Sequence, residues 1–463
     1  MNRRGSPRLN PQMDTSEEVA GITLCRSPRL HPQIHPSDED GTRMTRRIRR
    51  RRRGKSPATP ESVPLNEDML REILLRLPPQ PSSLLRASAV CSHWRGLVTD
   101  ARFLRRFRAH QGKPPLLGVF ELHIYGVQFR STLDPPDRIP GKLFDLPRQT
   151  GRRRRELLGC RHGCVLLLDV KQKQDNVIVC DPLTGEHHRL TAPPVFKGFH
   201  YIYGAVLCAA VDQDHVHGSC HSSPFKVILM SLRAGGHKAD TSPIACVYSS
   251  ETGVWGNLIS TTDPCELAGC NPGILIGNVL YWSSKSVRPN TYAYLDDFKD
   301  DIVEFDLDRQ SLGVIKGPPS LNDSLSHQII RAEDDALGLA ILSHGTFEVW
   351  QRRVNCQGAT TWLLQNTFEM HTLLGIPPQI AGTMRRMEIL GYDEDNGAIF
   401  VYVNAHVYTI QLMLMQFRKL YESPYPRICH PFTSFYAPDI IIPGGRDGVE
   451  ILEEHEVLEW FNR

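Results

Sequence analysis

Residues 64–98 read PLNEDMLREILLRLPPQPSSLLRASAVCSHWRGLV, and their apolar residues recur at three- and four-residue steps. This spacing is typical of amphipathic helices. Asn66 is a suitable N-cap for a first helix, and Pro78 and Pro79 end that helix because proline cannot continue a helical backbone. The predicted apolar stripe of this first helix consists of Met69, Leu70, Ile73, Leu74 and Leu77.

A second helix follows, for which Ser82 or Ser83 supplies the predicted cap. Its apolar residues are Leu84, Leu85, Ala87, Val90, Cys91, Trp94, Leu97 and Val98, and a short third segment contains Phe103, Leu104 and Phe107. A helical unit this small buries its own apolar surface poorly. We therefore expect it to pack on the rest of the chain or to bind a partner.

The first 60 residues are rich in Arg, Pro and Ser and contain 14 Lys and Arg against 6 Asp and Glu. Such a segment buries too little apolar surface to offset the entropy of ordering, so we expect it to be disordered. The tract TRRIRRRRRGK (45–55) is a candidate nuclear-import signal, and a solvated linker is the alternative. Its candidate residues are Arg46, Arg47, Arg49, Arg50, Arg51, Arg52 and Arg53. A contact with nucleic-acid phosphates is a further alternative. No aromatic residues are interleaved to stack on bases, so binding to single-stranded nucleic acid is not favoured.

The 12 cysteines are mostly single and lie within apolar runs. The N-terminus lacks the apolar region of a secretory signal peptide. We therefore expect reduced thiols in a protein of the nucleus, the cytoplasm or both. No run approaches the ~18–20 apolar residues of a membrane span, so we expect no membrane insertion.

From about residue 115 to 440 the sequence consists of short β-like runs separated by Gly, Pro, Asn and Asp. GCVLLLD (163–169) and NVIVCD (176–181) are predicted to be neighbouring strands, and Pro182 and Gly185 suit the turn that follows. Imperfect repetition of such hairpins predicts a β-propeller, whose blades take ~40–50 residues each. A β-sandwich is the alternative, and uneven spacing leaves the number of blades open.

The sequence contains no nucleophile elbow, phosphate-binding loop or zinc-protease motif, so catalysis is not expected. HVHGSCH (215–221) offers His215, His217, Cys220 and His221 as zinc ligands, but their spacing does not match known structural sites. A polar loop without a metal is the expectation there, and no cofactor is expected elsewhere. Cys160 and Cys164 are predicted to be buried structural thiols on one face of a single strand-like run.

Residues 64–107 resemble the F-box, the short motif that recruits the adaptor subunit of SCF-type cullin–RING ubiquitin ligases. The resemblance rests on several residues in order: Leu65, Asp68, the run EIL-x-RLPP, Leu85, Val90-Cys91, Trp94-Arg95 and Phe103. Asn66 departs from the proline that is usual in the family. The hairpin repeats that follow resemble the large plant group of F-box proteins with a β-propeller-like associated domain.

This resemblance implies a multidomain α + β protein with a three-helix F-box at 61–110, a β domain at 115–440 and tails at 1–60 and 441–463. It implies a non-catalytic ligase subunit that binds the adaptor, through it cullin, and an unknown target protein. The residues it implies for the adaptor interface, or its immediate support, are Leu65, Met69, Ile73, Leu77, Pro78, Leu85, Val90, Cys91, Trp94 and Leu97. The alternative is a nuclear interaction protein that binds nucleic acid through its basic tail.

Overall fold

The computed structural model describes residues 67–436, apart from 124–125, 145, 147–153, 171–174, 198–200, 211–214, 219, 221–222, 234–240, 266, 268–270, 284–300, 322–323, 325 and 377–385. These residues belong to one compact unit that begins at Pro64. Leu65, Asn66, the arginine tract and the two expected tails at 1–60 and 441–463 lie outside the described residues.

The described chain begins with four helices, where three were expected. They are α1 (Glu67–Leu75), α2 (Pro81–Val90), α3 (Ser92–Val98) and α4 (Ala101–Gln111). The extra division lies at Cys91, whose extended backbone (φ −166°, ψ 168°) separates α2 from α3. α1 ends before the two prolines, and a final turn is formed by hydrogen bonds from Arg76 N to Ile73 O and from Leu77 N to Leu74 O.

The capping of these helices also differs from the expectation. α2 begins at Pro81, whose fixed φ suits the first helical position, and neither Ser82 nor Ser83 caps it. Asp100 caps α4 instead, since its carboxylate accepts hydrogen bonds from Arg102 N at 3.1 Å and Phe103 N at 2.9 Å. The four helices enclose a core of their own, formed by Leu70, Leu74, Leu75, Leu84, Ala87, Leu97, Val98, Phe103, Leu104 and Phe107.

The strands form six antiparallel sheets within the part of the chain that the structure describes. We number these blades 1 to 6. Blade 1 consists of β1 (Leu116–His123), β2 (Gly126–Ser131) and β24 (Cys429–Thr433). Blade 2 consists of β3 (Arg154–Arg161), β4 (Cys164–Val170), β5 (Asn176–Cys180) and β6 (His187–Thr191). Blade 3 consists of β7 (Ile202–Cys208), β8 (Phe225–Arg233), β9 (Ser242–Ser249), β10 (Val254–Trp255) and β11 (Ile259–Ser260).

Each of the remaining blades has four strands. Blade 4 contains β12 (Ile274–Ile276), β13 (Val279–Ser283), β14 (Asp301–Asp306) and β15 (Ser311–Lys316). Blade 5 contains β16 (Ser326–Arg331), β17 (Leu337–Ser343), β18 (Thr346–Val354) and β19 (Thr360–Glu369), which a short helix, α5 (Met370–Leu373), follows. Blade 6 contains β20 (Met387–Asp393), β21 (Ala398–Val403), β22 (His406–Gln411) and β23 (Gln416–Glu422).

An Asp at a strand end recurs in the hairpins that the sequence predicted. Asp181, Asp306 and Asp393 each accept hydrogen bonds, through one carboxylate oxygen, from the backbone N–H groups two and three residues further on. In the first of these turns Gly185 has φ 74°, a conformation that glycine adopts without strain. The Asp-containing turns therefore have a common physical origin in an Asx turn at the end of a strand.

Hydrophobic clusters join each blade to its neighbours, and their order closes a ring. Separate clusters link blades 1 and 2, blades 2 and 3, blades 3 and 4, blades 4 to 6, and blades 6 and 1. The alternation along β4 shows why: Val165 and Leu167 pack toward blade 1, whereas Leu166 and Leu168 pack toward blade 3. Both faces of the sheet are buried, which explains the continuous apolar run in the sequence.

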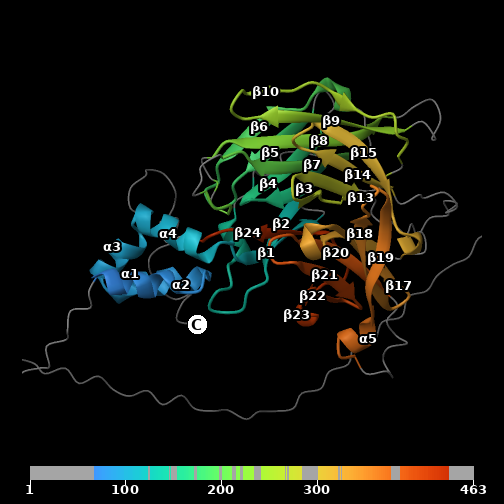
Figure 1. Ribbon diagram of the computed structural model, residues 1–463. Helices are drawn as coiled ribbons and strands as arrows, with labels where there is room; N and C mark the ends of the chain where they lie inside the picture. Colours follow the sequence, from blue (N-terminus) through green and yellow to red (C-terminus); the bar gives the residue numbers. More distant parts are fainter. Residues whose placement is uncertain are drawn as a thin grey trace, which may run out of the picture. The chain divides into compact units, whose positions relative to one another are not determined.

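This arrangement decides between the two predicted architectures. A sandwich buries one face of each sheet and leaves the other in water, whereas here both faces are covered and the sheets close on themselves. The fold is a six-bladed β-propeller preceded by a small helical unit. The ring closes within blade 1, where β24 lies beside β1 (Figure 1) and His430 pairs with Phe120.

Two further findings correct details of the sequence analysis. Cys160 and Cys164 do not share a strand, because a tight turn at His162 (φ 54°) and Gly163 (φ 80°) separates β3 from β4. Burial raises the pKa of both thiols, that of Cys164 to about 12. Among the described residues, no helix has the length and apolar character needed to span a membrane.

Candidate functional site

The helical unit exposes large apolar side chains on α1 and α2. Met69 and Ile73 lie one turn apart on α1 and are 58% and 50% exposed, and Val90 at the end of α2 is 60% exposed. Leu70 and Leu74, which the sequence placed on the same stripe, are instead buried in the core of the unit. α1 therefore has two apolar faces, one that holds the helices together and one that remains available for a partner.

The other residues predicted for the adaptor interface occupy three kinds of environment. Pro78 and Cys91 are exposed, and Leu77 and Trp94 are half-buried against the helical core. Leu97 and Leu85 are buried. The structure thus leaves some of the predicted residues at the surface and places others beneath it, where they support the helices.

Leu85 connects the helices to the propeller, one of the two alternatives that the sequence left open, whereas the resemblance had implied a role for Leu85 in the adaptor interface or its immediate support. Its side chain is 8% exposed and belongs to the cluster of blades 1 and 2, with Leu117 and Phe432 among its members. Close by in the sequence, Ser82 N donates a hydrogen bond of 2.9 Å to Asp137 Oδ1, from the segment that follows β2. Part of the apolar excess in residues 64–98 is therefore buried by the chain itself.

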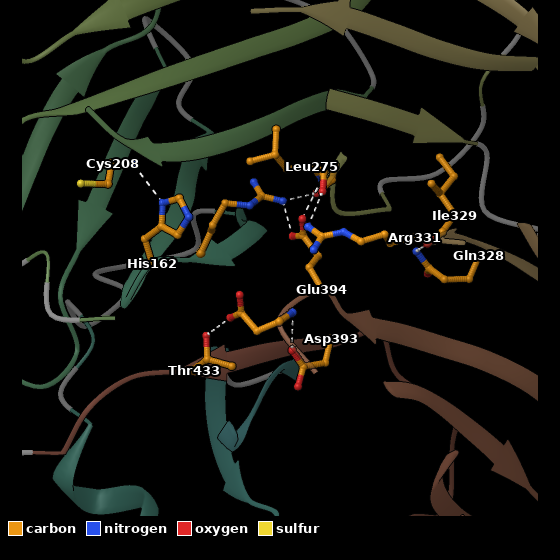
Figure 2. Close-up of polar contacts among 12 residues, drawn as sticks. His162, Cys208, Leu275, Gln328, Ile329, Arg331, Asp393, Glu394 and Thr433 are labelled. Carbon is orange, nitrogen blue, oxygen red and sulfur yellow. Dashed lines mark hydrogen bonds and ion pairs between the residues drawn. The ribbon is translucent and has the colours of Figure 1, made fainter. Parts of the chain in front are cut away.

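A charged network lies where the first strands of the blades meet. Arg161, at the end of β3, forms an ion pair with Glu394 and also donates to Gly273 O at 2.7 Å. Figure 2 shows Glu394 close to Leu275, whose backbone N–H donates to the second carboxylate oxygen at 2.7 Å. Arg331 of blade 5 donates to Leu275 O at 3.4 Å. These contacts tie blades 2, 4, 5 and 6 together.

The turn between β20 and β21, which carries Glu394, also contacts β24, the strand that closes the ring. Thr433 Oγ1 donates to Asp395 Oδ2 at 2.6 Å (Figure 2 labels Thr433). Burial raises the pKa of Glu394, and the neighbouring Arg161 guanidinium opposes this effect. Both carboxylate oxygens of Glu394 accept hydrogen bonds from the protein, so the geometry assigns this residue to holding the blades together.

A recess of about 510 Å³ lies beside the buried Glu121 of β1, between β2 and β23. Tyr421 donates to Glu121 Oε1 at 2.5 Å, and His123 Nε2 lies 3.1 Å from Oε2. Arg130 stacks over the Tyr421 ring at 4.4 Å from its centroid. The recess therefore offers a cationic and aromatic rim above a carboxylate that is already paired.

The predicted polar loop contributes to a compact cluster of sulfur and nitrogen atoms. His215 Nε2 lies 3.2 Å from Cys208 Sγ and 3.3 Å from Cys220 Sγ, and Cys220 Sγ lies 3.7 Å from His217 Nδ1. The hydrogen bond between the two thiols lowers the pKa of Cys208 and raises that of Cys220. His221 lies outside the described residues. Cys208 was not linked to this loop by the sequence, because it stands at the end of the preceding strand.

Comparison with known proteins agrees with both parts of the chain. The model of the F-box domain family matches residues 64–106. The model of the F-box protein AT5G49610-like β-propeller matches residues 156–439, which is more than half of the chain. The chain belongs to this family of F-box propeller proteins. We call α1–α4 the F-box from here on.

Three relatives from Arabidopsis thaliana show how the similarity is distributed. F-box protein At5g49610 is 22% identical over 323 residues, which cover 68% of this chain and 81% of the relative. F-box/kelch-repeat protein At3g61590 is 27% identical over 225 residues, which cover 47% of this chain and 51% of the relative. F-box protein At3g17710 is 51% identical over 45 residues, 10% of this chain and 12% of the relative.

Proposed function

We propose that this F-box propeller protein is the substrate-receptor subunit of an SCF-type cullin–RING ubiquitin ligase. The F-box binds the adaptor and through it cullin, and the propeller holds a target protein. The chain would perform no bond chemistry, and would act by raising the effective concentration of the target near a charged ubiquitin carrier.

The observation that carries this proposal is the second apolar face of α1. Met69 and Ile73 are at least half exposed although the neighbouring Leu70 and Leu74 are buried. Exposed aliphatic side chains on a helix, next to a rigid core, suit a protein–protein interface in which a few residues supply most of the binding energy. The half-buried Trp94 packs on the same helical core and supports that surface from within.

The test is co-purification of the full-length chain with the adaptor subunit. The paired substitution Met69→Asp and Ile73→Asp should reduce adaptor binding by about two orders of magnitude or more, because it places charges in the apolar contact. Both residues are exposed in the free protein, so the melting temperature should stay close to that of the wild type.

Val254→Asp is the matched control, because Val254 is 60% exposed but lies on β10 of blade 3. It should leave adaptor binding unchanged. The proposal fails if the wild-type chain does not retain the adaptor, or if the paired variant retains it as well as the control does. Leu85→Ala and Trp94→Ala are less suitable tests, since both side chains pack inside the protein.

We also propose that the arginine tract at 45–55 directs the protein into the nucleus, on the basis of its composition. Deletion of residues 43–55 should then shift the full-length protein toward the cytoplasm, as fluorescence microscopy of a tagged chain would show. An unchanged nuclear signal after the deletion would exclude this role. Nucleic-acid binding by the same tract would instead appear as salt-dependent retention on DNA that the deletion removes.

A further inference from the structure

Four potential metal ligands meet beside β7, and the proposed ligase function does not use them. Cys208 ends β7, whereas His215, His217 and Cys220 belong to the connection between β7 and β8. Their ligand atoms all lie within 4.8 Å of one another. This grouping is the only such set of at least three His, Cys, Asp or Glu residues found among the residues that the structure describes.

Three distances within the cluster are close to the edges of a tetrahedral metal site. With Zn–S bonds of about 2.3 Å and Zn–N bonds of about 2.05 Å, tetrahedral geometry places neighbouring ligand atoms about 3.3–3.8 Å apart. The contacts of His215 Nε2 with the two sulfurs are 3.2 and 3.3 Å, and the Cys220 Sγ to His217 Nδ1 contact is 3.7 Å. The four atoms therefore lie close enough together for small side-chain shifts to bring all of them onto one ion.

We propose that Cys208, His215, His217 and Cys220 bind a Zn²⁺ ion in a closed Cys2His2 site. Two thiolates and two neutral imidazoles form a ligand set that suits zinc and leaves no open position for substrate. The charges of two thiolates also balance those of the ion. The role that follows is structural, and the site adds to the ligase function without depending on it.

The surroundings orient the ligands in the manner of a second coordination shell. The His162 ring stacks on the His217 ring, with centroids 3.7 Å apart and planes 10° from parallel. His162 Nδ1 also accepts a hydrogen bond of 3.1 Å from Cys208 N, and Figure 2 shows these two residues side by side. One histidine from the turn between β3 and β4 thus positions both a sulfur ligand and a nitrogen ligand.

The loop that carries the ligands contacts the place where the propeller ring closes. Gly218 O accepts hydrogen bonds from Ser434 Oγ at 2.8 Å and from Phe435 N at 2.9 Å, just after β24. A side chain at Gly218 would collide with Pro114, in the link between α4 and β1. A bound zinc ion would therefore stabilise the contacts of this loop with the chain just before β1 and just after β24.

Metal analysis of the full-length protein, incubated with zinc without chelator and then freed of unbound metal by gel filtration, tests the proposal directly. We expect about one zinc per chain. Replacement by Co²⁺ should give the intense visible absorption of tetrahedral cobalt and a thiolate-to-cobalt charge-transfer band. Zinc removal by a strong chelator should lower the melting temperature of the wild type.

The variant Cys208→Ser with Cys220→Ser should lose both the zinc and the cobalt spectrum. His217→Ala is the milder variant, since His217 is exposed, and it should weaken zinc affinity while the chain stays folded. The control pairs Cys356→Ser with His344→Ala, two exposed residues of blade 5 turns, and should bind zinc as the wild type does.

Two results would overturn the proposal. The first is wild-type protein that contains no zinc and gives no tetrahedral cobalt spectrum. The second is a Cys208–Cys220 disulfide, found by peptide mapping without reduction, in wild-type protein that also binds no zinc after the disulfide has been reduced. Both readouts use the wild-type chain, so they decide the question even if the double cysteine variant does not fold.

Discussion

Asp393 accepts the hydrogen bonds that form a turn, although its side chain is almost completely buried. Its carboxylate accepts hydrogen bonds from Asp395 N, Asn396 N and the Asn396 side chain, and its exposure is only 1%. Burial raises its pKa from 3.8 to about 7, an effect that these hydrogen bonds oppose only in part. The charged form is therefore disfavoured in the folded protein, although the turn uses its oxygens.

This shift predicts a pH dependence of stability. Between about pH 4 and about pH 7 the folded protein holds a proton on Asp393 that the unfolded chain releases, so stability falls as pH rises through this window. Asp393→Asn removes the titration and should gain stability relative to the wild type as pH rises, by an amount on the order of a few kcal/mol. Melting temperatures of both proteins across this range would measure the difference.

Asp306→Asn provides the control for Asp393→Asn. Asp306 occupies the equivalent turn between β14 and β15 and makes the same backbone contacts, at 3.0 Å to Asp308 N and 2.8 Å to Arg309 N, but it is half-buried. Its substitution should give a smaller pH-dependent difference. The prediction is wrong if the difference in melting temperature between Asp393→Asn and the wild type stays constant with pH, because the Asp393 carboxyl group would then contribute nothing to the pH dependence of stability.

At the scale of elements, the sequence predicted the strands well and the helices only in part. GCVLLLD and NVIVCD pair as β4 and β5, because apolar runs flanked by turn residues have few alternatives to a strand. The break at Cys91 could not be read from residue spacing, since the apolar pattern continues through it. The sequence left propeller and sandwich open because hairpins in both use the same turns, and the contacts between sheets distinguish them.

The candidate sites likewise separate into residues that the sequence could indicate and residues that it could not. Positions within one helix, such as Met69 and Ile73, could be proposed from the sequence because the family motif is local. His162 lies in the turn between β3 and β4 and meets His217 only after blades 2 and 3 have packed. Cys208 lies seven residues before His215, at the end of β7. No spacing rule would have joined His162 to this loop. Cys208 was not included because the apolar run that it ends was interpreted as a strand, separate from the polar loop.

Leu85 tests the contact between an α2 side chain and the propeller. Leu85→Ala should lower the free energy of unfolding by about 2–5 kcal/mol, because it removes a buried side chain from a packed cluster. Thermal or denaturant unfolding of the full-length chain would measure the loss. Ile73→Ala is the matched control, since that side chain is half exposed and should change stability by well under 1 kcal/mol.

The outcome that contradicts this assignment is equal destabilisation by the two substitutions. In that case Leu85 would contribute no more than an exposed aliphatic residue does. A loss of adaptor binding by Leu85→Ala without any loss of stability would instead place this side chain in the interface itself.

At the scale of the whole molecule, closure of the ring depends on a short C-terminal strand. β24 pairs with β1, and Phe432 is 1% exposed within a cluster of aromatic rings that includes Phe120, Phe129 and Phe144. On the neighbouring blade, a side chain at Gly391 would collide with the backbone of Cys429. Blades 6 and 1 therefore meet along a tightly packed seam.

Phe432→Ala should loosen that seam. We expect a loss of about 3–5 kcal/mol of stability and faster hydrogen exchange in β24, β1 and the adjoining strands β3 and β20. Hydrogen-exchange mass spectrometry of the full-length protein would map the change. Phe417→Ala on β23, where the side chain is 42% exposed, should affect exchange only locally; the same widespread change in both variants would contradict a special role for the seam.

The position of β24 also determines the order in which the parts can form during synthesis. The four helices of the F-box make contacts over short sequence distances and can fold as soon as they leave the ribosome. The propeller cannot close until Cys429–Thr433 has emerged, more than 300 residues after the partner strand β1. Until then the growing chain already carries its exposed Met69 and Ile73 but has an unpaired edge on β1. Under the proposed function, translation products that stop before β24 would compete for the adaptor while lacking a complete propeller.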